Sequence, residues 1–371
     1  MPKQPTVYDV ARRAGVSTAT VSRTLSRPDE VRAATRDAVL AAVDELGYVP
    51  SAAARGLASR RAGTLGLLFP DADGVGATDT GELPVLTTTG RTEVEIVRDR
   101  RTAPTTSMVD LFTAEVVRGA ELEAWRAGLA VTIAVARGSS ATAMAADMAG
   151  RVDGMAVLSA TLPDDDLQRI ARRIPVVVMA AHDREDGLDH VHVDNRSAMR
   201  ALVGHLVDEH GYRDLAFFGG PAGSPDGEER FAAFQEVLRD RGVPVPEAPI
   251  ARSAFTYETA REATTALLQR GVGALPRVLV CANDQTALGA LDVLREAGVE
   301  VPERVALTGF DGIDASARSR PRLTTVEQPM RDVGRAAIDR LLARLADPAL
   351  PAATVGLPVR VLLRESCGCT G

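Results

Sequence analysis

Features that mark several other protein classes are missing from this sequence. No apolar run approaches the length of a bilayer-spanning helix, so we expect no membrane segment. The N-terminal stretch MPKQPTVYDVARRAG has neither a continuous apolar segment nor a small-residue cleavage site. We therefore expect no secretory signal and a cytoplasmic protein. Hydrophobic residues make up 45% and charged residues 25% of the chain, as in ordinary globular proteins.

Cysteine is scarce, with three residues in the chain: Cys281, Cys367 and Cys369. Three cysteines are too few for a disulfide framework, and none has a histidine at the sequence spacing of a zinc site. Two nearby thiols cannot close a tetrahedral site by themselves. We therefore expect Cys367-Gly-Cys369 to be an incidental pair, and we expect neither a metal nor a cofactor.

Signatures of catalysis are also missing. The sequence shows no Ser-His-Asp order, no metal cluster and no phosphate-binding loop, and none of its five histidines belongs to a recognisable catalytic motif. A carbohydrate enzyme would need a base, an acid or a nucleophile of this kind. We therefore expect that the protein is not an enzyme.

Length and charge indicate two parts with different partners. A chain of 371 residues exceeds a single typical core, so we expect a small module joined to a large domain of two lobes. Through Arg61, ten Lys or Arg accompany six Asp or Glu, a net charge of +4, and the overall charge of -7 leaves -11 for the remainder. A basic head on an acidic body suits DNA binding at one end only.

Three short helices are predicted near the N-terminus. Apolar residues at spacings of three and four predict one helix over Val7–Ala14. Ser17 is placed as the N-cap of a second helix over Thr18–Leu25. A third helix is expected over about Arg32–Gly47, where glycine is a common C-terminal stop. The three helices share one small core.

The outward face of the second helix carries small, hydroxyl-rich side chains beside a cation. Small side chains let backbone and hydroxyl groups approach phosphates, and Arg23 can contact a phosphate or a guanine edge in the major groove. The pattern favours a DNA-recognition helix, and the alternative is an ordinary solvated face. The outward residues are Ser17, Thr18, Ala19, Thr20, Ser22 and Arg23.

From Thr64 onward, short β-rich runs alternate with helical stretches. Runs that are apolar on both faces are typical of parallel sheets covered by helices. We expect an α/β body of two doubly wound lobes of the periplasmic-binding-protein kind, with a ligand cleft past the carboxyl ends of the strands. The predicted strands are Leu65–Phe69, Ala130–Val135, Gly154–Leu158, Val176–Met179, Leu215–Phe218, Val278–Cys281 and Val305–Thr308.

A long N-terminal segment adds a more specific indication. TVYDVARRAGVSTATVSRTLSRPDEVRAATRDAVLAAVDELGYVPSAAARGLASRRAGTLGLLFP resembles the head, hinge and first core strand of the LacI/GalR family of bacterial repressors. CANDQTALGALDVLREAGVEVPERVALTGFDGI, LTTVEQPMRDVGRAAIDRLLARL and LPVRVLLRESCG resemble later core segments of this family, in the expected order. The resemblance implies a homodimeric repressor that binds double-stranded, palindromic operator DNA under allosteric control by a sugar-like effector.

The resemblance also implies a division of the chain. A helix-turn-helix DNA-binding domain is expected at 1–50, a hinge at 51–61, and an effector-binding and dimerisation core at 62–371. Within the core we expect an N-lobe of about 62–195 and 328–355 and a C-lobe of about 196–327 and 356–366.

The same resemblance assigns DNA contacts. Thr18 and Ala19 occupy the two main base-reading positions. In the hinge, Leu57 would wedge open a central step from the minor groove, for which we expect a CG step. The alternative is an alanine-rich linker with no role on DNA. The other implied contacts are Thr6, Tyr8, Ser17, Thr20, Ser22, Arg23, Thr35 and Tyr48 in the head, with Ser51 (in place of the family's usual Asn) and Arg55 in the hinge.

Five body residues are implied to contact the effector. Asn283 and Asp311 each follow a strand, and Arg230 stands where the family has its effector-binding arginine. Together they suit a polyhydroxylated or anionic small molecule, and the alternative for each is a structural hydrogen bond. Phe112 and Phe255 correspond to aromatic positions that either stack on the ligand or fill the core.

Two departures from the family matter. Ala180 stands where several sugar-responsive members carry Asp, which removes one acceptor for a hydroxyl. An insertion over about 72–108 adds roughly 36 residues, long for a connection, and we expect a lid or a partner surface there. Its RDRR run at 98–101 favours a solvated tip. A periplasmic solute receptor would share the body but would have no use for residues 1–61.

Overall fold

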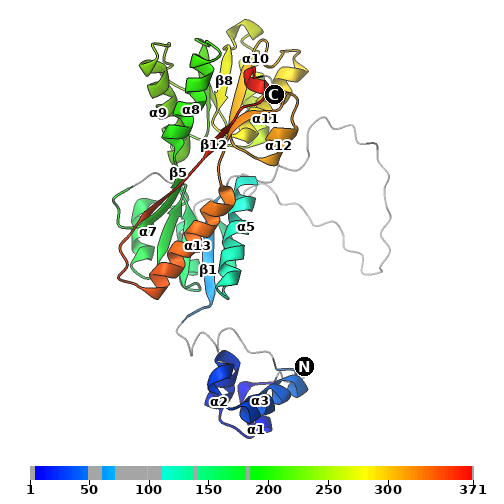
Figure 1. Cartoon of the computed structure of the whole chain (residues 1–371), viewed down its shortest axis with the longest axis vertical. Coiled ribbons are helices and arrows are strands. Elements are labelled where there is room, and N and C mark those ends of the chain that lie inside the picture. Colours follow the sequence, from blue (N-terminus) through cyan, green and yellow to red (C-terminus); the bar gives the residue numbers. More distant parts are fainter. Residues whose placement is uncertain are drawn as a thin grey trace. The chain divides into compact units, whose positions relative to one another are not determined.

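A computed structural model describes residues 5–48, 61–71, 98, 111–136, 141–180 and 184–369 (Figure 1). The chain forms two compact units, residues 1–64 with 151–153, and residues 65–150 with 154–371. Among the helices in the described residues, none is both long and apolar enough to cross a bilayer. We describe each unit by itself.

The first unit contains the three predicted helices. α1 covers Val7–Ala14, α2 covers Thr18–Ser26 and α3 covers Ala33–Leu46, with a 3-10 turn, η1, at Pro28–Glu30. The helices are short, so most of their stability comes from packing their apolar faces together. The buried side chains of this core are Val10, Ala11, Val21, Val39 and Ala42.

The second unit contains two lobes, each built on a six-stranded sheet. The first sheet has the order β11-β5-β4-β3-β1-β2. Its strands are β1 (Thr64–Pro70), β2 (Ala130–Ala136), β3 (Gly154–Leu158), β4 (Val176–Met179), β5 (Asp189–Val193) and β11 (Thr354–Leu357). Its helices are α5 (Leu111–Arg126), α6 (Ala141–Ala149), α7 (Asp164–Ala171) and α13 (Met330–Ala346).

The second sheet has the order β12-β10-β9-β8-β6-β7, with β12 antiparallel to β10. Its strands are β6 (Leu215–Gly219), β7 (Ala251–Arg252), β8 (Val278–Cys281), β9 (Ala306–Asp311), β10 (Thr324–Glu327) and β12 (Arg360–Leu362). Its helices are α8 (Asn195–Asp208), α9 (Pro225–Asp240), α10 (Tyr257–Leu268), α11 (Asp284–Glu296) and α12 (Asp314–Arg318), with 3-10 turns η3 (Val272–Ala274) and η4 (Glu365–Cys367).

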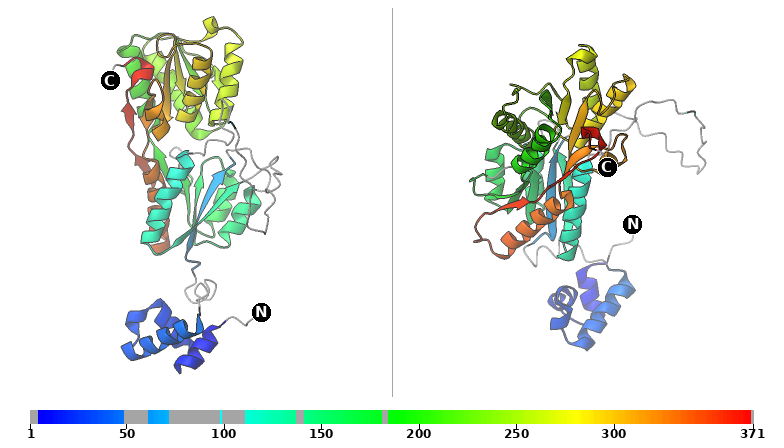
Figure 2. Two further views of the ribbon diagram at one scale, coloured as in Figure 1. Left: turned by 90° about the vertical axis from the view of Figure 1, so that its right-hand side faces the viewer. Right: turned by 45° about the horizontal axis from the view of Figure 1, so that its top comes forward.

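Helices lie on both sides of each sheet (Figure 2). Successive side chains of a strand point to opposite faces, so a strand between two helical layers must be apolar at every position. In β6, Leu215 and Phe217 pack with α8 and α9, whereas Ala216 and Phe218 pack with α10 and α11. This explains why such strands could be predicted as continuous apolar runs.

The chain passes between the lobes three times within the described residues, after β5, after β10 and between β11 and β12. Figure 1 shows α13 lying beside α5 after the second passage. The two helices approach closely because Gly334 has no side chain. A Cβ atom there would lie 2.0 Å from the Val116 carbonyl oxygen. The last passage lies beyond Leu357, two residues past the change of lobe expected after residue 355.

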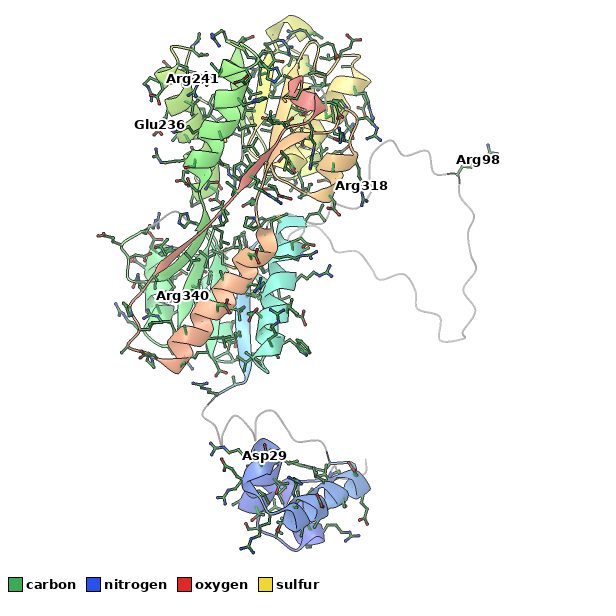
Figure 3. The ribbon with its side chains drawn as sticks, viewed as in Figure 1. Asp29, Arg98, Glu236, Arg241, Arg318 and Arg340 are labelled. Carbon is green, nitrogen blue, oxygen red and sulfur yellow. The ribbon has the colours of Figure 1, made fainter. Side chains whose placement is uncertain are left out.

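A buried ion pair fixes α13 to the first sheet. Asp189 of β5 is fully buried, and its carboxylate accepts hydrogen bonds from Arg340 Nε at 2.9 Å and from the Ala353 N–H at 3.0 Å. Arg344 Nε lies 2.9 Å from the same carboxylate. Figure 3 labels Arg340 on α13. Because a buried carboxylate needs such partners, this return of the chain is part of the first lobe's core.

The predicted fold class is confirmed: the protein is α/β, with a helical head and two doubly wound lobes. The strands predicted over 154–158, 176–179 and 278–281 have those bounds, whereas the one predicted over 305–308 is found at Ala306–Asp311. Hinge residues 51–60 and, apart from Arg98, the insertion at 72–108 lie outside the described residues.

Candidate DNA-binding head and effector cavity

The second helix of the head begins as predicted. The Ser17 hydroxyl accepts a hydrogen bond from the Thr20 N–H at 3.1 Å, which makes Ser17 the N-cap of α2. The Asp9 carboxylate accepts hydrogen bonds from the Thr6 N–H at 2.9 Å and the Thr6 hydroxyl at 2.7 Å, which stabilises the start of α1. These caps fix two helix N-termini on which N–H groups can face a phosphate.

The outward face of α2 is exposed as the periodicity predicts. Ser17, Ala19, Ser22 and Arg23 are exposed and Thr18 and Thr20 are half-buried, whereas Val21 is fully buried. Among the described residues, Arg23 has no acidic partner, although several other arginines of the head do. A cation without such a partner is available to an external anion.

The remaining predicted DNA contacts differ in exposure. Tyr8 is 69% exposed, whereas Thr6, Thr35 and Tyr48 are half-buried, and the Tyr48 ring packs on the head core. The hinge residues Ser51, Arg55 and Leu57 lie outside the described residues. The head thus presents one exposed face on α2.

A cavity of about 520 Å³ lies between the two lobes, where strands of both sheets end. Residues directly after β1, β3 and β4 line it from the first lobe, and residues at the ends of β6, β8 and β9 line it from the second. The five residues predicted to contact the effector, spread over some 200 positions of the sequence, all line this one cavity: Phe112, Arg230, Phe255, Asn283 and Asp311.

Arg230 of α9 is 3% exposed and is held on three sides. Its Nε donates to Asn195 Oδ1 and its Nη1 donates to the Ala282 carbonyl oxygen, each at 2.8 Å. Its Cζ atom lies 3.6 Å from the centre of the Phe310 ring, which is a cation–π contact. The guanidinium has five N–H groups, so donors remain for a ligand after these contacts.

Asp311 ends β9 and faces the cavity from a buried position. Its Oδ1 accepts a hydrogen bond of 2.6 Å from Gln328 Nε2, and Gln328 itself lines the cavity. Nearby, the fully buried Asp284 accepts hydrogen bonds from the N–H groups of Gly312 and Ile313, each at 2.9 Å. Burial and the neighbouring Asp311 raise the pKa of Asp284 well above its usual value. Of these two carboxylates, Asp311 is the one that lines the cavity.

Asn283 lines the cavity, but its amide also has structural partners. Oδ1 accepts from the N–H of Thr286 at 2.9 Å and so caps α11, while Nδ2 donates to the Phe255 carbonyl oxygen at 2.9 Å. Asn283 thus fixes the segment that carries Phe255. Both readings of Asn283 in the sequence, ligand contact and structural hydrogen bond, are compatible with this geometry.

The cavity wall contains unusual backbone. In the described residues, four non-glycine residues have positive φ: Ala160, Ala180, Phe255 and Asp311, with φ of 60°, 54°, 64° and 123°. All four line the cavity. Positive φ is costly for residues with a side chain, and such residues cluster at ligand sites. The backbone conformation therefore indicates the same cavity independently of the family resemblance.

Sequence reasoning missed several polar lining residues. Gln328 follows β10 in the segment LTTVEQPM, so its place just past a strand was the available signal. Asp71 follows β1, and Asp226 lies in the first turn of α9. Potential metal ligands in groups of three or more occur once in the described residues, in a cluster that does not line the cavity.

Comparison with known proteins agrees with this arrangement. Residues 6–51 match the family described as "Bacterial regulatory proteins, lacI family", and residues 203–367 match a "Periplasmic binding protein-like domain". The HTH-type transcriptional repressor CytR of Escherichia coli K12 is 31% identical over 92% of this chain and 89% of its own length. Catabolite control protein A of Priestia megaterium is 28% identical over 97% of this chain and 98% of its own.

Solved structures are similar over almost the whole chain. The lac repressor dimer bound to operator and the anti-inducer ONPF has a TM-score of 0.77 at 25% identity, over 98% of this chain and 99% of that one. The transcriptional regulator CelR in complex with cellobiose has a TM-score of 0.67 at 28% identity, over 98% and 99%. These relatives regulate transcription and are not enzymes. The chain belongs to the lacI family of bacterial regulatory proteins.

Proposed function

We propose that this protein is a cytoplasmic transcriptional repressor that binds a palindromic operator as a dimer. A neutral, polyhydroxylated small molecule raises or lowers its affinity for this operator. The observation that carries the proposal is the convergence of five predicted effector residues on one cavity of about 520 Å³. This volume lies within the range of about 300–1,000 Å³ that is usual for small-molecule sites. The exposed face of α2 supplies the other half of the proposal.

Charge favours a neutral effector over an anionic one. Three carboxylates line the cavity, those of Asp71, Asp226 and Asp311, against the single guanidinium of Arg230 among the described lining residues. Asp226 Oδ2 lies 4.0 Å from Arg230 Nη2 and partly neutralises it. A phosphate would therefore meet more repulsion than attraction. Hydroxyl groups can instead donate to the carboxylates and accept from the guanidinium.

The aromatic side chains of the cavity suit a ring with apolar faces. Phe112 and Phe255 line the same cavity as the polar groups. A sugar ring presents C–H groups on its faces and hydroxyl groups at its rim, so it matches apolar walls and a polar floor together. The structural relative CelR was solved with cellobiose, which is a compound of this kind.

Exposed apolar side chains on the first lobe support dimerisation. Leu122 and Trp125 of α5 are 39% and 69% exposed, and their spacing of three residues places them on one face of the helix. Ile133 on β2 is 49% exposed. Exposed apolar side chains that lie together usually mark an interface. A twofold dimer would present two heads to a palindromic site, with Leu57 of each hinge at the central step.

The proposed mechanism is a shift between two states of the dimer. Effector in the cavity changes the closure of the lobes, which alters the spacing of the two hinges and hence operator affinity. Because the coupling is reciprocal, operator must change effector affinity by the same factor.

The DNA half is tested by fluorescence anisotropy of the full chain on palindromic duplexes with a CG centre, selected from a random library, against scrambled duplexes. We expect a strong preference for one palindrome. Leu57→Ala should cost about 1–3 kcal/mol of affinity for that palindrome and leave binding to scrambled DNA almost unchanged. Equal loss on both duplexes would exclude a wedge.

The effector half is tested by a thermal-shift screen of neutral sugars, sugar phosphates and nucleosides, since a bound ligand raises the melting temperature by mass action. We expect a neutral sugar to raise it and its phosphate ester to have no effect. A shift with phosphates alone would contradict the charge argument. The active compound is then added to the operator assay.

A further inference from the structure

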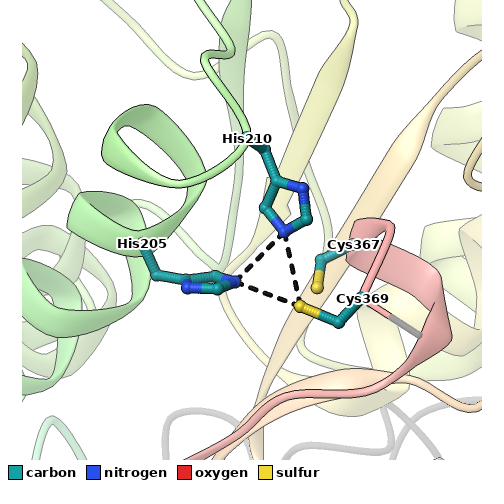
Figure 4. A group of neighbouring side chains, drawn as sticks. All are labelled: His205, His210, Cys367 and Cys369. Atoms are coloured by element: carbon teal, nitrogen blue, oxygen red, sulfur yellow. Dashed lines mark hydrogen bonds between the residues drawn. The ribbon is translucent and has the colours of Figure 1, made fainter. Parts of the chain in front are cut away.

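Four potential metal ligands meet in the second lobe although they come from two distant parts of the sequence. His205 lies in the last turn of α8 and His210 just after this helix, whereas Cys367 and Cys369 belong to the C-terminal segment around η4. One ligand atom from each residue lies within 4.8 Å of all the others. Figure 4 shows the two imidazoles and the two thiols pointing toward one another.

Three distances in this His/Cys cluster are close to those of a tetrahedral site. His205 Nε2 lies 3.1 Å from His210 Nε2 and 3.2 Å from Cys369 Sγ, and His210 Nε2 lies 3.4 Å from Cys369 Sγ. Tetrahedral zinc binds nitrogen at about 2.0–2.1 Å and sulfur at about 2.3 Å, which places neighbouring ligand atoms roughly 3.3–3.8 Å apart. His205, His210 and Cys369 would need to move by only a few tenths of an ångström, and Cys367 Sγ lies within 4.8 Å of their three ligand atoms.

Hydrogen bonds alone cannot satisfy this triangle. A neutral imidazole nitrogen carries either one hydrogen or one lone pair, so it takes part in one good hydrogen bond. Here each of the two Nε2 atoms has two close polar neighbours, the other Nε2 and Cys369 Sγ. One ion at the centre would use one lone pair from each atom and satisfy all of them together.

The surrounding fold holds the cluster in place. The Tyr212 hydroxyl donates to the Cys367 carbonyl oxygen at 3.0 Å, and the His210 ring stacks on Tyr212 with centroids 5.2 Å apart. Gly368 has a φ of 100°, and a Cβ atom there would lie 3.0 Å from the Tyr212 hydroxyl and 3.5 Å from His210. This glycine therefore allows the turn that brings both thiols to the histidines.

We propose that His205, His210, Cys367 and Cys369 form a zinc site that fastens the C-terminal segment to α8. Two thiolates and two imidazoles are a donor set that zinc prefers, and four protein ligands leave no open position, as in structural sites. Both thiols bind zinc as thiolates, so zinc binding releases their protons. No residue of the cluster lines the effector cavity.

The site has a defined place relative to that cavity. α8 runs from Asn195, which holds Arg230, to the His/Cys cluster, so one helix joins the two. A metal at its C-terminal end would restrain the helix that positions the candidate effector residue. The metal site does not depend on the proposed function, because its test needs neither DNA nor effector.

The test uses the full chain without a histidine tag, purified with and without added zinc. Elemental analysis after exhaustive dialysis should give one zinc per chain. Cobalt substituted for zinc should give the absorption of tetrahedral cobalt together with a thiolate charge-transfer band. Cobalt with neither band, or zinc well below one equivalent, would overturn the proposal. A mass lower by two hydrogens, which indicates a Cys367–Cys369 disulfide in the protein as purified, would also overturn it.

Matched variants separate the site from folding. Cys369→Ser and His205→Gln should each weaken zinc binding by about 100-fold or more, whereas Cys281→Ala and His192→Gln, which change the same residue types elsewhere, should not. Zinc should raise the melting temperature of the controls and not that of the site variants. Equal zinc binding by Cys369→Ser and Cys281→Ala would contradict the assignment, and the cobalt spectrum of the unaltered chain stays decisive if a variant fails to fold.

Discussion

The two lobes have the same strand order, but they contribute different chemistry to the cavity. Counted from one edge, the first sheet runs β2-β1-β3-β4-β5 and the second runs β7-β6-β8-β9-β10, each completed by one C-terminal strand. The first lobe contributes largely apolar and small side chains, such as Phe112, Leu158 and Ala180. The second contributes Arg230 and Asp311. The same scaffold thus presents mainly apolar side chains to the cavity in the first lobe, here called the wall, and the polar side chains of Arg230 and Asp311 in the second, here called the floor. The difference arises because the residues after each strand differ.

Hydrogen bonds within the protein already orient the side chains of the floor in the absence of a ligand. Arg230 is held by Asn195 and Ala282, and Asp311 is held by Gln328. Groups that are already held lose little entropy on binding, so we expect Arg230 and Asp311 to contribute affinity and selectivity. Apart from polar groups such as the Asp71 carboxylate, the first lobe lines the cavity largely with apolar or small side chains, so we expect it to contribute mainly closure and exclusion of water.

The largest expected effect is on the stability of the first lobe. Asp189→Ala leaves the half-buried Arg340 and Arg344 without their carboxylate, and removing one partner of a buried ion pair costs about 3–5 kcal/mol. We expect hydrogen exchange to speed up in peptides of the first sheet and to change little in the second sheet. Urea unfolding measures the total loss.

The control for Asp189→Ala is an ion pair on the other lobe. Asp208 of α8 pairs with Arg241 at the end of α9, labelled in Figure 3, and the Asp208 side chain is 51% exposed. Exposed pairs contribute little, so Asp208→Ala should leave the unfolding curve nearly unchanged. If the two variants unfold alike, the first lobe does not depend on the returning helix α13.

Next in size is the effect of the polar floor on ligand affinity. Asp311→Ala removes a charged acceptor and leaves Gln328 without its partner. A hydrogen bond to a charged group is worth about 1.5–3 kcal/mol, which corresponds to roughly 10- to 150-fold in affinity. Calorimetry with the neutral sugar found in the screen measures it. Asp314→Ala, only three residues away and with a side chain 93% exposed, should bind as the unaltered chain does.

Periodicity sufficed for strands that are apolar on both faces. β3, β4 and β8 were predicted to the residue for that reason. β5 was missed because its sequence, DHVHV, buries Asp189 and His190, whose polarity hides the strand. β11 and β12 are short and partly exposed, so they carry no clear pattern either. Tertiary partners, which the local sequence does not show, allow these segments to form strands.

The effector cavity and the His/Cys cluster also differ in how far the sequence could predict them. The candidate effector residues were accessible through a family resemblance. Gln328 had only its place just past a strand as a signal, because its role depends on the contact with Asp311. The His/Cys cluster was missed although His205 and His210 have the H-x4-H spacing that is common for zinc ligands. Its histidines and cysteines lie more than 150 residues apart, and spacing rules recognise only ligands that are close in sequence. The expectation of an incidental cysteine pair followed from that limit.

A smaller effect is expected from the wall. Phe112→Leu keeps apolar bulk on the first-lobe side of the cavity and removes the aromatic ring, and an aromatic contact is worth about 0.5–1.5 kcal/mol beyond its burial. We expect affinity for the same sugar to fall by roughly 2- to 12-fold, well short of the effect of Asp311→Ala. Phe112→Ala, which also loses the burial, should lie between these two variants. A loss equal to that of Asp311→Ala would remove the distinction between wall and floor.

The smallest expected effect concerns the N-cap of α8, the helix that carries Asn195 and through it holds Arg230. Asp194 accepts a hydrogen bond from the Ser197 N–H at 2.9 Å and so caps α8, which positions Asn195. Ser197 holds the pKa of Asp194 below its usual 3.8, so the cap contributes fully above 3.8 and is lost as pH falls through the lower, folded-state value. Asp194→Ala should cost about 0.5–1 kcal/mol at neutral pH, since the site is exposed. Asp194→Asn, whose amide caps without titrating, should keep that stability and lose part of the acid dependence in urea unfolding. If Asp194→Asn and Asp194→Ala have the same stability at neutral pH, the Asp194 side chain does not stabilise α8 as an N-cap.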